Sequence, residues 1–169
     1  MRLPNRKTTV TLLRLIHIVS GGFWAGAGML MGWFVAPAAR SAGPGAGPFM
    51  QALLKRKVTT VLVSAGIVTV GGGLWLWAIR RPTMTRWQDW ALAIGAASAI
   101  VALTIGIGWQ RPTTARMSAL GSEIASGGAP PTPQQAGDLQ ALQGKVGRFA
   151  SIISSLFAIA LAGMALGGG

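Results

Sequence analysis

Four long apolar blocks dominate the pattern of hydrophobic and polar positions along the chain. They cover residues 15–36, 58–79, 90–109 and 149–166, and none of them contains Lys, Arg, Asp or Glu. An α-helix rises about 1.5 Å per residue, so about 20 apolar residues cross the hydrocarbon core of a bilayer. Transmembrane strands would alternate over about ten residues, and these blocks do not alternate. The pattern therefore predicts an all-α protein with four transmembrane helices in one domain.

The polar sequence between the third and fourth blocks predicts that both helices continue beyond the bilayer. Apolar residues recur at helical spacing on either side of a turn rich in Gly and Pro at 127–131, namely Met117, Leu120 and Ile124 before it and Leu139, Leu142 and Val146 after it. Two helices with such stripes can pack against each other as an antiparallel hairpin. We therefore expect a four-helix transmembrane bundle whose third and fourth helices extend as a hairpin over residues 111–148.

Two capping boxes mark helix starts in this pattern. In a capping box, a Ser or Thr and a Gln or Glu three residues later bond each other's backbone N–H groups. Thr132 and Gln135 fit this spacing, with Pro133 at the first helical position, where proline is favoured. Thr85 and Gln88 fit it as well. We expect these two pairs to open the fourth and the third helix.

Composition and charge support a membrane protein and exclude nucleic acid as a partner. Only 11% of the residues are charged, against about 25% in soluble domains, yet the net charge is +12. The basic residues bracket the apolar blocks instead of forming one patch, as expected for contacts with anionic lipid. We expect a multi-pass protein of the bacterial inner (plasma) membrane. Basic residues are nearly balanced between the two sides, and we place both termini outside the cytoplasm.

Four tryptophans are expected at one membrane interface. Trp75 and Trp77 end the second block, while Trp87 and Trp90 open the third. An indole at this depth buries its ring and keeps its N–H in contact with water. The connection between the second and third helices is therefore expected to lie just outside this interface.

His17 is the one ionisable residue inside the four blocks, and ionisable residues inside membranes are often functional. It could bind a metal, bind a haem or handle a proton, or it could be a neutral histidine bonded to a neighbour or to water. A second haem ligand would have to be methionine. Copper(I) accepts methionine too, but Met29 lies about three turns from His17. We expect no resident cofactor, with copper and haem as the alternatives and His17 as the candidate metal ligand.

The first block also contains two small-xxx-small pairs. Gly22 and Gly26 form one pair, and Gly28 and Gly32 form the other. Such pairs let two helix backbones approach closely in a membrane. They are expected to pack against another helix of this bundle, or alternatively to dock a membrane protein partner or a second copy of the chain.

No constellation for catalysis is recognisable. The chain has no cysteine, which excludes thiolate chemistry, and beside His17 it has no second histidine to build a triad or a zinc site. Glu123 and Asp138 lie in the polar loop, and Asp89 is expected in the first turn of the third helix, where a carboxylate complements the helix dipole. We therefore expect a protein without enzymatic activity.

The first block resembles the opening helix of a known family. The run Leu-Leu-Arg-Leu-Ile-His-Ile at 12–18, followed by Gly-Gly-Phe-Trp-Ala-Gly at 21–26, is similar to that helix in the copper resistance protein D-like family of bacterial membrane proteins. Weaker likeness continues through Gly-Pro at 43–44, Gly-Leu-Trp at 73–75 and the Pro- and Gln-rich segment 130–143. The resemblance implies a role in copper tolerance or uptake. The alternative is a structural or accessory subunit of a larger membrane complex.

Overall fold

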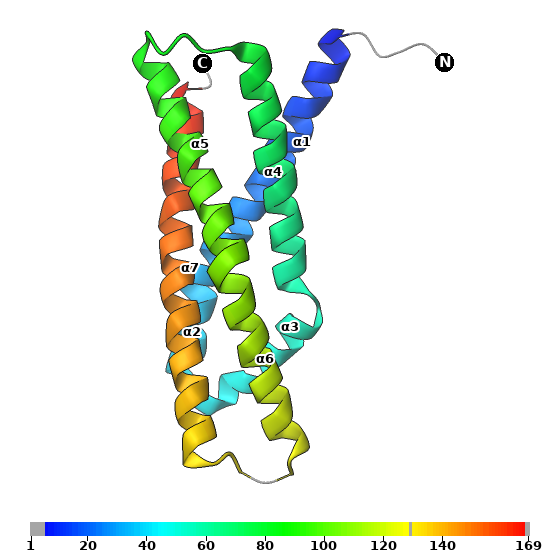
Figure 1. Cartoon of the computed structure of the whole chain (residues 1–169), viewed down its shortest axis with the longest axis vertical. Coiled ribbons are helices and arrows are strands. Elements are labelled where there is room, and N and C mark those ends of the chain that lie inside the picture. Colours follow the sequence, from blue (N-terminus) through cyan, green and yellow to red (C-terminus); the bar gives the residue numbers. More distant parts are fainter. Residues whose placement is uncertain (1–5, 129, 168–169) are drawn as a thin grey trace, which may run out of the picture.

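The computed structural model describes residues 6–128 and 130–167, and this part of the chain is helical almost throughout and contains no strand. Four long segments run up and down the molecule (Figure 1). They are α1 (Arg6–Met29) continued by the π-helical η1 (Leu30–Val35) and α2 (Ala36–Ser41); α4 (Val58–Arg80); α5 (Trp87–Ile105) continued by the π-helical η3 (Gly106–Gln110) and α6 (Arg111–Ser126); and α7 (Pro133–Gly167). The predicted all-α fold is confirmed.

Each of the four segments is long and apolar enough to cross a membrane. Large apolar side chains point outward along them: Ile18 is 67% exposed, Phe34 65% and Trp75 63%. Exposed apolar surface on this scale is unusual for a soluble monomer, whereas lipid tails would cover it. The fold is therefore that of a multi-pass integral membrane protein.

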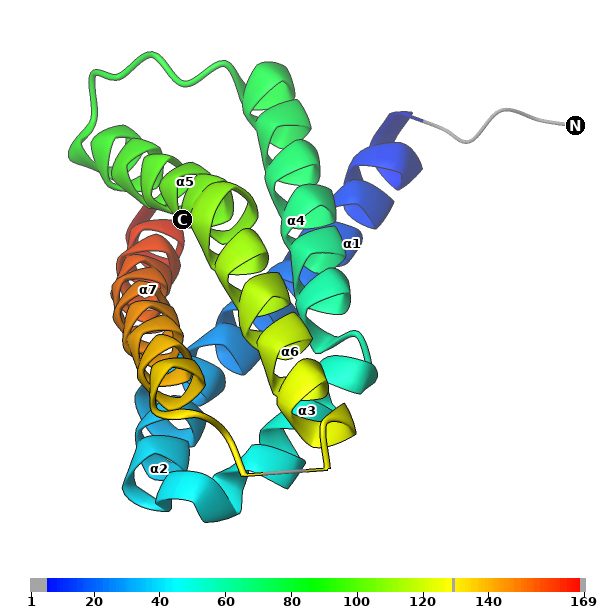
Figure 2. The same ribbon diagram turned by 60° about the horizontal axis from the view of Figure 1, so that its bottom comes forward.

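The four segments associate as two pairs. α1 packs mainly on α4, and α5 packs mainly on α7, while the consecutive helices α4 and α5 make fewer contacts with each other. Figure 2 shows α4 and α5 diverging toward the loop that joins them. The two pairs meet where α1 crosses α7. Residues of all four segments line a cavity between the two pairs.

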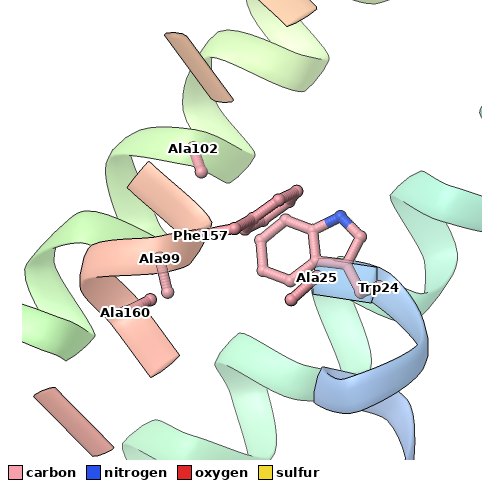
Figure 3. Packing of buried hydrophobic residues seen from close by; sticks show 6 residues of the cluster. All are labelled: Trp24, Ala25, Ala99, Ala102, Phe157 and Ala160. Carbon is pink, nitrogen blue, oxygen red and sulfur yellow. The ribbon is translucent and has the colours of Figure 1, made fainter. Parts of the chain in front are cut away.

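The central contact between the pairs is aromatic. Trp24 of α1 meets Phe157 of α7 edge to face, with ring centroids 4.6 Å apart and an interplanar angle of 71° (Figure 3). The buried residues beside these two rings on α5 and α7 are small, namely Ala99, Ala102 and Ala160, and the larger Leu103, Ile153 and Leu156 pack around them. On α4, a Cβ added to Gly66 would lie 2.7 Å from Cε2 of Trp24, so this glycine makes room for the indole.

The predicted hairpin is present in the structure. α6 packs against the first part of α7, and the turn between them lies at the far end of the bundle from the end of α7 (Figure 1). Met117 is buried, and the other stripe residues named above are half-buried. The Thr132 N–H donates to Oε1 of Gln135 at 3.0 Å, and the Gln135 N–H donates to Oγ1 of Thr132 at 3.2 Å. This capping box is confirmed.

The capping box predicted at Thr85 is wrong. α5 begins at Trp87, with Arg86 at its N-cap and no side-chain hydrogen bond to the cap. The Thr85 hydroxyl instead lies 2.9 Å from that of Thr83. The helix starts one residue later than this capping box requires, so Thr85 lies one residue before the N-cap and Gln88 is the second helical residue instead of the third.

The connection between the first two spans is more helical than expected. After α2 the chain forms the 3₁₀-helix η2 (Gly43–Ala46) and then α3 (Gly47–Lys55). α3 turns back beneath the bundle, where it contacts α4 and α6. The side-chain amide of Gln51 lies directly over Gly121, so a larger residue at 121 would displace it.

Candidate ligand site between the helix pairs

His17 joins α1 to α4 through its ring. Its Nδ1 lies 2.8 Å from the backbone carbonyl oxygen of Thr69. The imidazole packs against two glycines of α4: a Cβ added to Gly73 would lie 2.8 Å from Cε1, and one added to Gly72 would lie 3.6 Å from the His17 Cβ. The glycines at this end of α4 therefore provide the groove in which the ring lies.

This contact fixes the tautomer of the imidazole. A carbonyl oxygen only accepts hydrogen bonds, so Nδ1 of His17 must donate to Thr69. In the neutral ring Nε2 then has the lone pair and is an acceptor. Among the described residues no hydrogen-bond partner of Nε2 is found. His17 thus matches the expectation of a histidine bonded to a neighbour, and it keeps one acceptor for another molecule.

A short polar chain supports the same helix pair. The Thr69 hydroxyl lies 2.8 Å from the Ala65 carbonyl oxygen and 2.9 Å from Oγ of Ser20. Ser20 in turn donates to the carbonyl oxygen of Ile16 at 2.7 Å. Thr69 is only 2% exposed, so its carbonyl is held rigidly for His17 by both helices.

His17 lines a cavity of about 240 Å³ between the two helix pairs. The cavity extends from the Trp24–Phe157 contact toward the end of α7, and every long segment contributes to its wall. Its other lining residues are small or apolar apart from Thr69, namely Ile18, Gly21, Gly22, Ala25, Ala99, Ala160, Leu161 and Met164. The arrangement is an apolar chamber with one imidazole in its wall, and it is open to the outside of the bundle beside the exposed Ile18 and Gly22.

The structure gives His17 one soft neighbour as a candidate metal ligand. Met164 of α7 lines the same cavity, whereas Met29 packs against the aromatic core. Within the described residues, no three His, Cys, Asp or Glu side chains come together to hold a metal ion. Met164 was missed from the sequence. The up-and-down order of four spans could have found it, because that order places the start of the first span level with the end of the fourth.

The four glycines of the first span lie in two different environments. A Cβ added to Gly28 would overlap the Phe157 ring, and one added to Gly32 would lie 2.6 Å from the Ala150 carbonyl oxygen, so both lie against α7. Gly22 and Gly26 are exposed, and an added Cβ would meet no atom within 4 Å. Packing inside this chain therefore does not require glycine at positions 22 and 26.

The four tryptophans predicted to lie at a membrane interface and the buried Asp89 lie together at one end of the bundle. Trp75 and Trp77 belong to the end of α4, and Trp87 and Trp90 to the start of α5. The side chain of Asp89 is only 8% exposed, and its Oδ1 lies 3.9 Å from Nη2 of Arg80. As expected, Asp89 belongs to the first turn of α5.

Comparison with models of known protein families finds no match for this chain, and comparisons with curated proteins and with solved structures find none either. The class of protein is therefore defined by the fold alone. It is a multi-pass helical membrane protein with a small apolar cavity between two helix pairs.

Proposed function

We propose that this chain is a small transport- or tolerance-associated membrane protein without enzymatic activity, and that it holds its ligand in the His17 cavity. The observation that carries the proposal is the combination of an apolar chamber with one imidazole in its wall, whose Nδ1 is already bonded to Thr69. Small-molecule sites are mostly apolar concavities with a few placed polar groups. A tolerance or transport role agrees with the family resemblance of the first span.

Copper is the ligand that the resemblance implies. His17 and Met164 are the two lining residues whose side chains offer donor atoms that copper(I) accepts. A copper site here would therefore depend on both residues. Loss of copper from only one of the two variants His17→Ala and Met164→Leu would argue against a shared site.

The test is extraction in a mild detergent followed by identification of what copurifies, with metals and haem measured alongside small molecules. Gly22→Leu is the informative variant, because Gly22 lines the cavity and has open space beside it. Gly26→Leu is the matched control, one turn further along the outside of α1. We expect a stoichiometric small ligand in the wild type and in Gly26→Leu, and its loss from Gly22→Leu.

An accessory subunit is the second candidate, and the exposed Gly26 favours it. A glycine on the outside of a membrane helix leaves a shallow groove that a helix of another subunit can enter. In this case Gly26→Leu would remove a copurifying protein and the small ligand would be absent from all three preparations. That outcome would replace the proposed function with a structural role.

A further inference from the structure

We infer that the cavity takes an uncharged ring compound with one hydroxyl group, and that this hydroxyl donates to Nε2 of His17. The inference rests on the proposed function, because it names the ligand class for the same cavity. Three observations lead to it: the size of the chamber, the composition of its wall, and the direction of the hydrogen bond that His17 already makes.

The size of the chamber fits one or two fused rings. Its volume is about 240 Å³. An apolar cavity of about 150 Å³ is known to hold benzene. The floor is itself aromatic, since Trp24 and Phe157 close the chamber toward the middle of the bundle. Aromatic rings pair favourably in stacked or edge-to-face geometry, so a flat ring is a suitable occupant.

The wall disfavours a charged ligand. Among the lining residues none is acidic, and the side chains with a nitrogen or oxygen atom are those of His17, Thr69 and Trp24, whose indole can only donate. Thr69 is already engaged with Ser20 and Ala65, which leaves the ring nitrogen of His17 as the acceptor for a ligand. A buried charge without partners costs far more free energy than a buried hydroxyl with one hydrogen bond. An uncharged ligand is therefore the better match.

The hydrogen bond to Thr69 selects a donor over an acceptor. Because Nδ1 of His17 donates to the carbonyl, Nε2 of the neutral ring accepts. A ketone or ether would place two acceptors against each other, whereas a hydroxyl would supply the missing proton. The site should consequently distinguish a phenol from the same ring without its O–H.

The experiment uses 1-naphthol, naphthalene and 1-methoxynaphthalene as probes of the purified full chain in detergent. We expect 1-naphthol to bind roughly 3- to 10-fold more tightly than the other two, as for one neutral hydrogen bond. His17→Phe should remove this preference while naphthalene still binds. Because that variant also loses the bond to Thr69, the comparison of the three probes on the wild type serves as an independent readout.

Gly22→Leu and Gly26→Leu distinguish a failure of the hydroxyl preference from a failure of the cavity as a binding site. Equal binding of the three probes to the wild type, with none to Gly22→Leu, would overturn the hydroxyl preference and leave the cavity as a site. Binding to Gly22→Leu as tight as to the wild type would overturn the cavity as well, because the probes would then dissolve in detergent. Copper(I) bound stoichiometrically through His17 and Met164 would overturn the ligand class.

Discussion

At the scale of single residues, Gly28 shows how the two helix pairs are held together. The fully buried ring of Phe157 occupies the space where a side chain of residue 28 would begin. Beside it, the hydroxyl of Ser154, 0% exposed, donates to the Ala150 carbonyl oxygen at 2.8 Å and lies 3.2 Å from the Gly28 carbonyl oxygen. The Phe157 ring and the Ser154 hydroxyl thus both contact α1 at Gly28, where the missing side chain lets α7 come close.

Gly28→Leu should therefore destabilise the bundle. Overpacking of a filled interface costs about 1–3 kcal/mol, so the midpoint of thermal unfolding in detergent should fall clearly. Gly26→Leu is the matched control and should be nearly neutral, because lipid tails are about as apolar as leucine. Equal melting temperatures for the two variants would show that the contact with Phe157 does not limit stability.

The same residues show what a sequence can and cannot indicate about a site. Gly22 and Gly26 have the same spacing as Gly28 and Gly32, but six residues turn a helix by about two thirds of a circle beyond one full turn. The two pairs therefore face different neighbours. His17 could be selected because it is ionisable, whereas its partner could not, since a backbone carbonyl leaves no mark in a sequence.

At the scale of helices, α5 and α7 form the closest pair, and glycine makes this possible. A Cβ added to Gly163 would lie 2.5 Å from the Ala91 carbonyl oxygen and 2.7 Å from Cα of Gly95. One added to Gly95 would lie 3.0 Å from the Ala160 carbonyl oxygen. Backbone faces backbone here, so the neighbours cannot move aside as a flexible side chain would.

Gly163→Ala should consequently lower the free energy of unfolding by about 1–3 kcal/mol, although alanine is the better helix former. The control lies in the same helix. Gly144 is exposed and has no atom within 4 Å of an added Cβ, so Gly144→Ala should stabilise by up to about 1 kcal/mol. Urea or thermal unfolding of both variants measures the difference, and stabilisation by Gly163→Ala would contradict the close approach.

The position of a helix was predictable from the sequence where a long apolar block or a capping box marks it. The four uncharged blocks indicated the spans, and Thr132 with Gln135 indicated where α7 begins. The π-helical segments η1 and η3 were not predictable, because they insert an extra residue into a turn without a distinct composition. α3 was missed since it is short and begins among Gly and Pro residues that usually mark loops.

At the scale of the whole molecule, Arg80 joins three helices at the end where α4 and α5 diverge. Its Nη1 donates to the carbonyl oxygen of Gly167 at 3.0 Å, and its Nη2 lies 3.9 Å from Oδ1 of Asp89. The end of α4, the start of α5 and the end of α7 are thereby linked. This link lies at the end of the bundle toward which the cavity extends.

Arg80→Gln should loosen this end of the bundle. The variant leaves Asp89, which is nearly buried, without the cation beside it, and loss of such a partner costs about 1–3 kcal/mol. Arg81→Gln is the control, because Arg81 is exposed and follows α4 directly. Hydrogen exchange of the amides at the ends of α4 and α7 should accelerate in Arg80→Gln, and unchanged exchange there would rule out the link as a determinant of stability.

The topology of the whole chain is the central claim, and single-cysteine labelling tests it most directly. The protein contains no cysteine, so each substitution introduces one reactive thiol. Of the sites for Ser126→Cys, Gly45→Cys and Thr83→Cys, Ser126 is the last residue of α6, and Gly45 lies in the connection between the first two spans at the same end of the bundle, whereas Thr83 lies in the connection at the other end (Figure 1). With a membrane-impermeant maleimide on sealed vesicles, the fold predicts that positions 126 and 45 are labelled from one side and position 83 from the opposite side. Labelling of positions 126 and 83 from the same side would contradict the four-span fold.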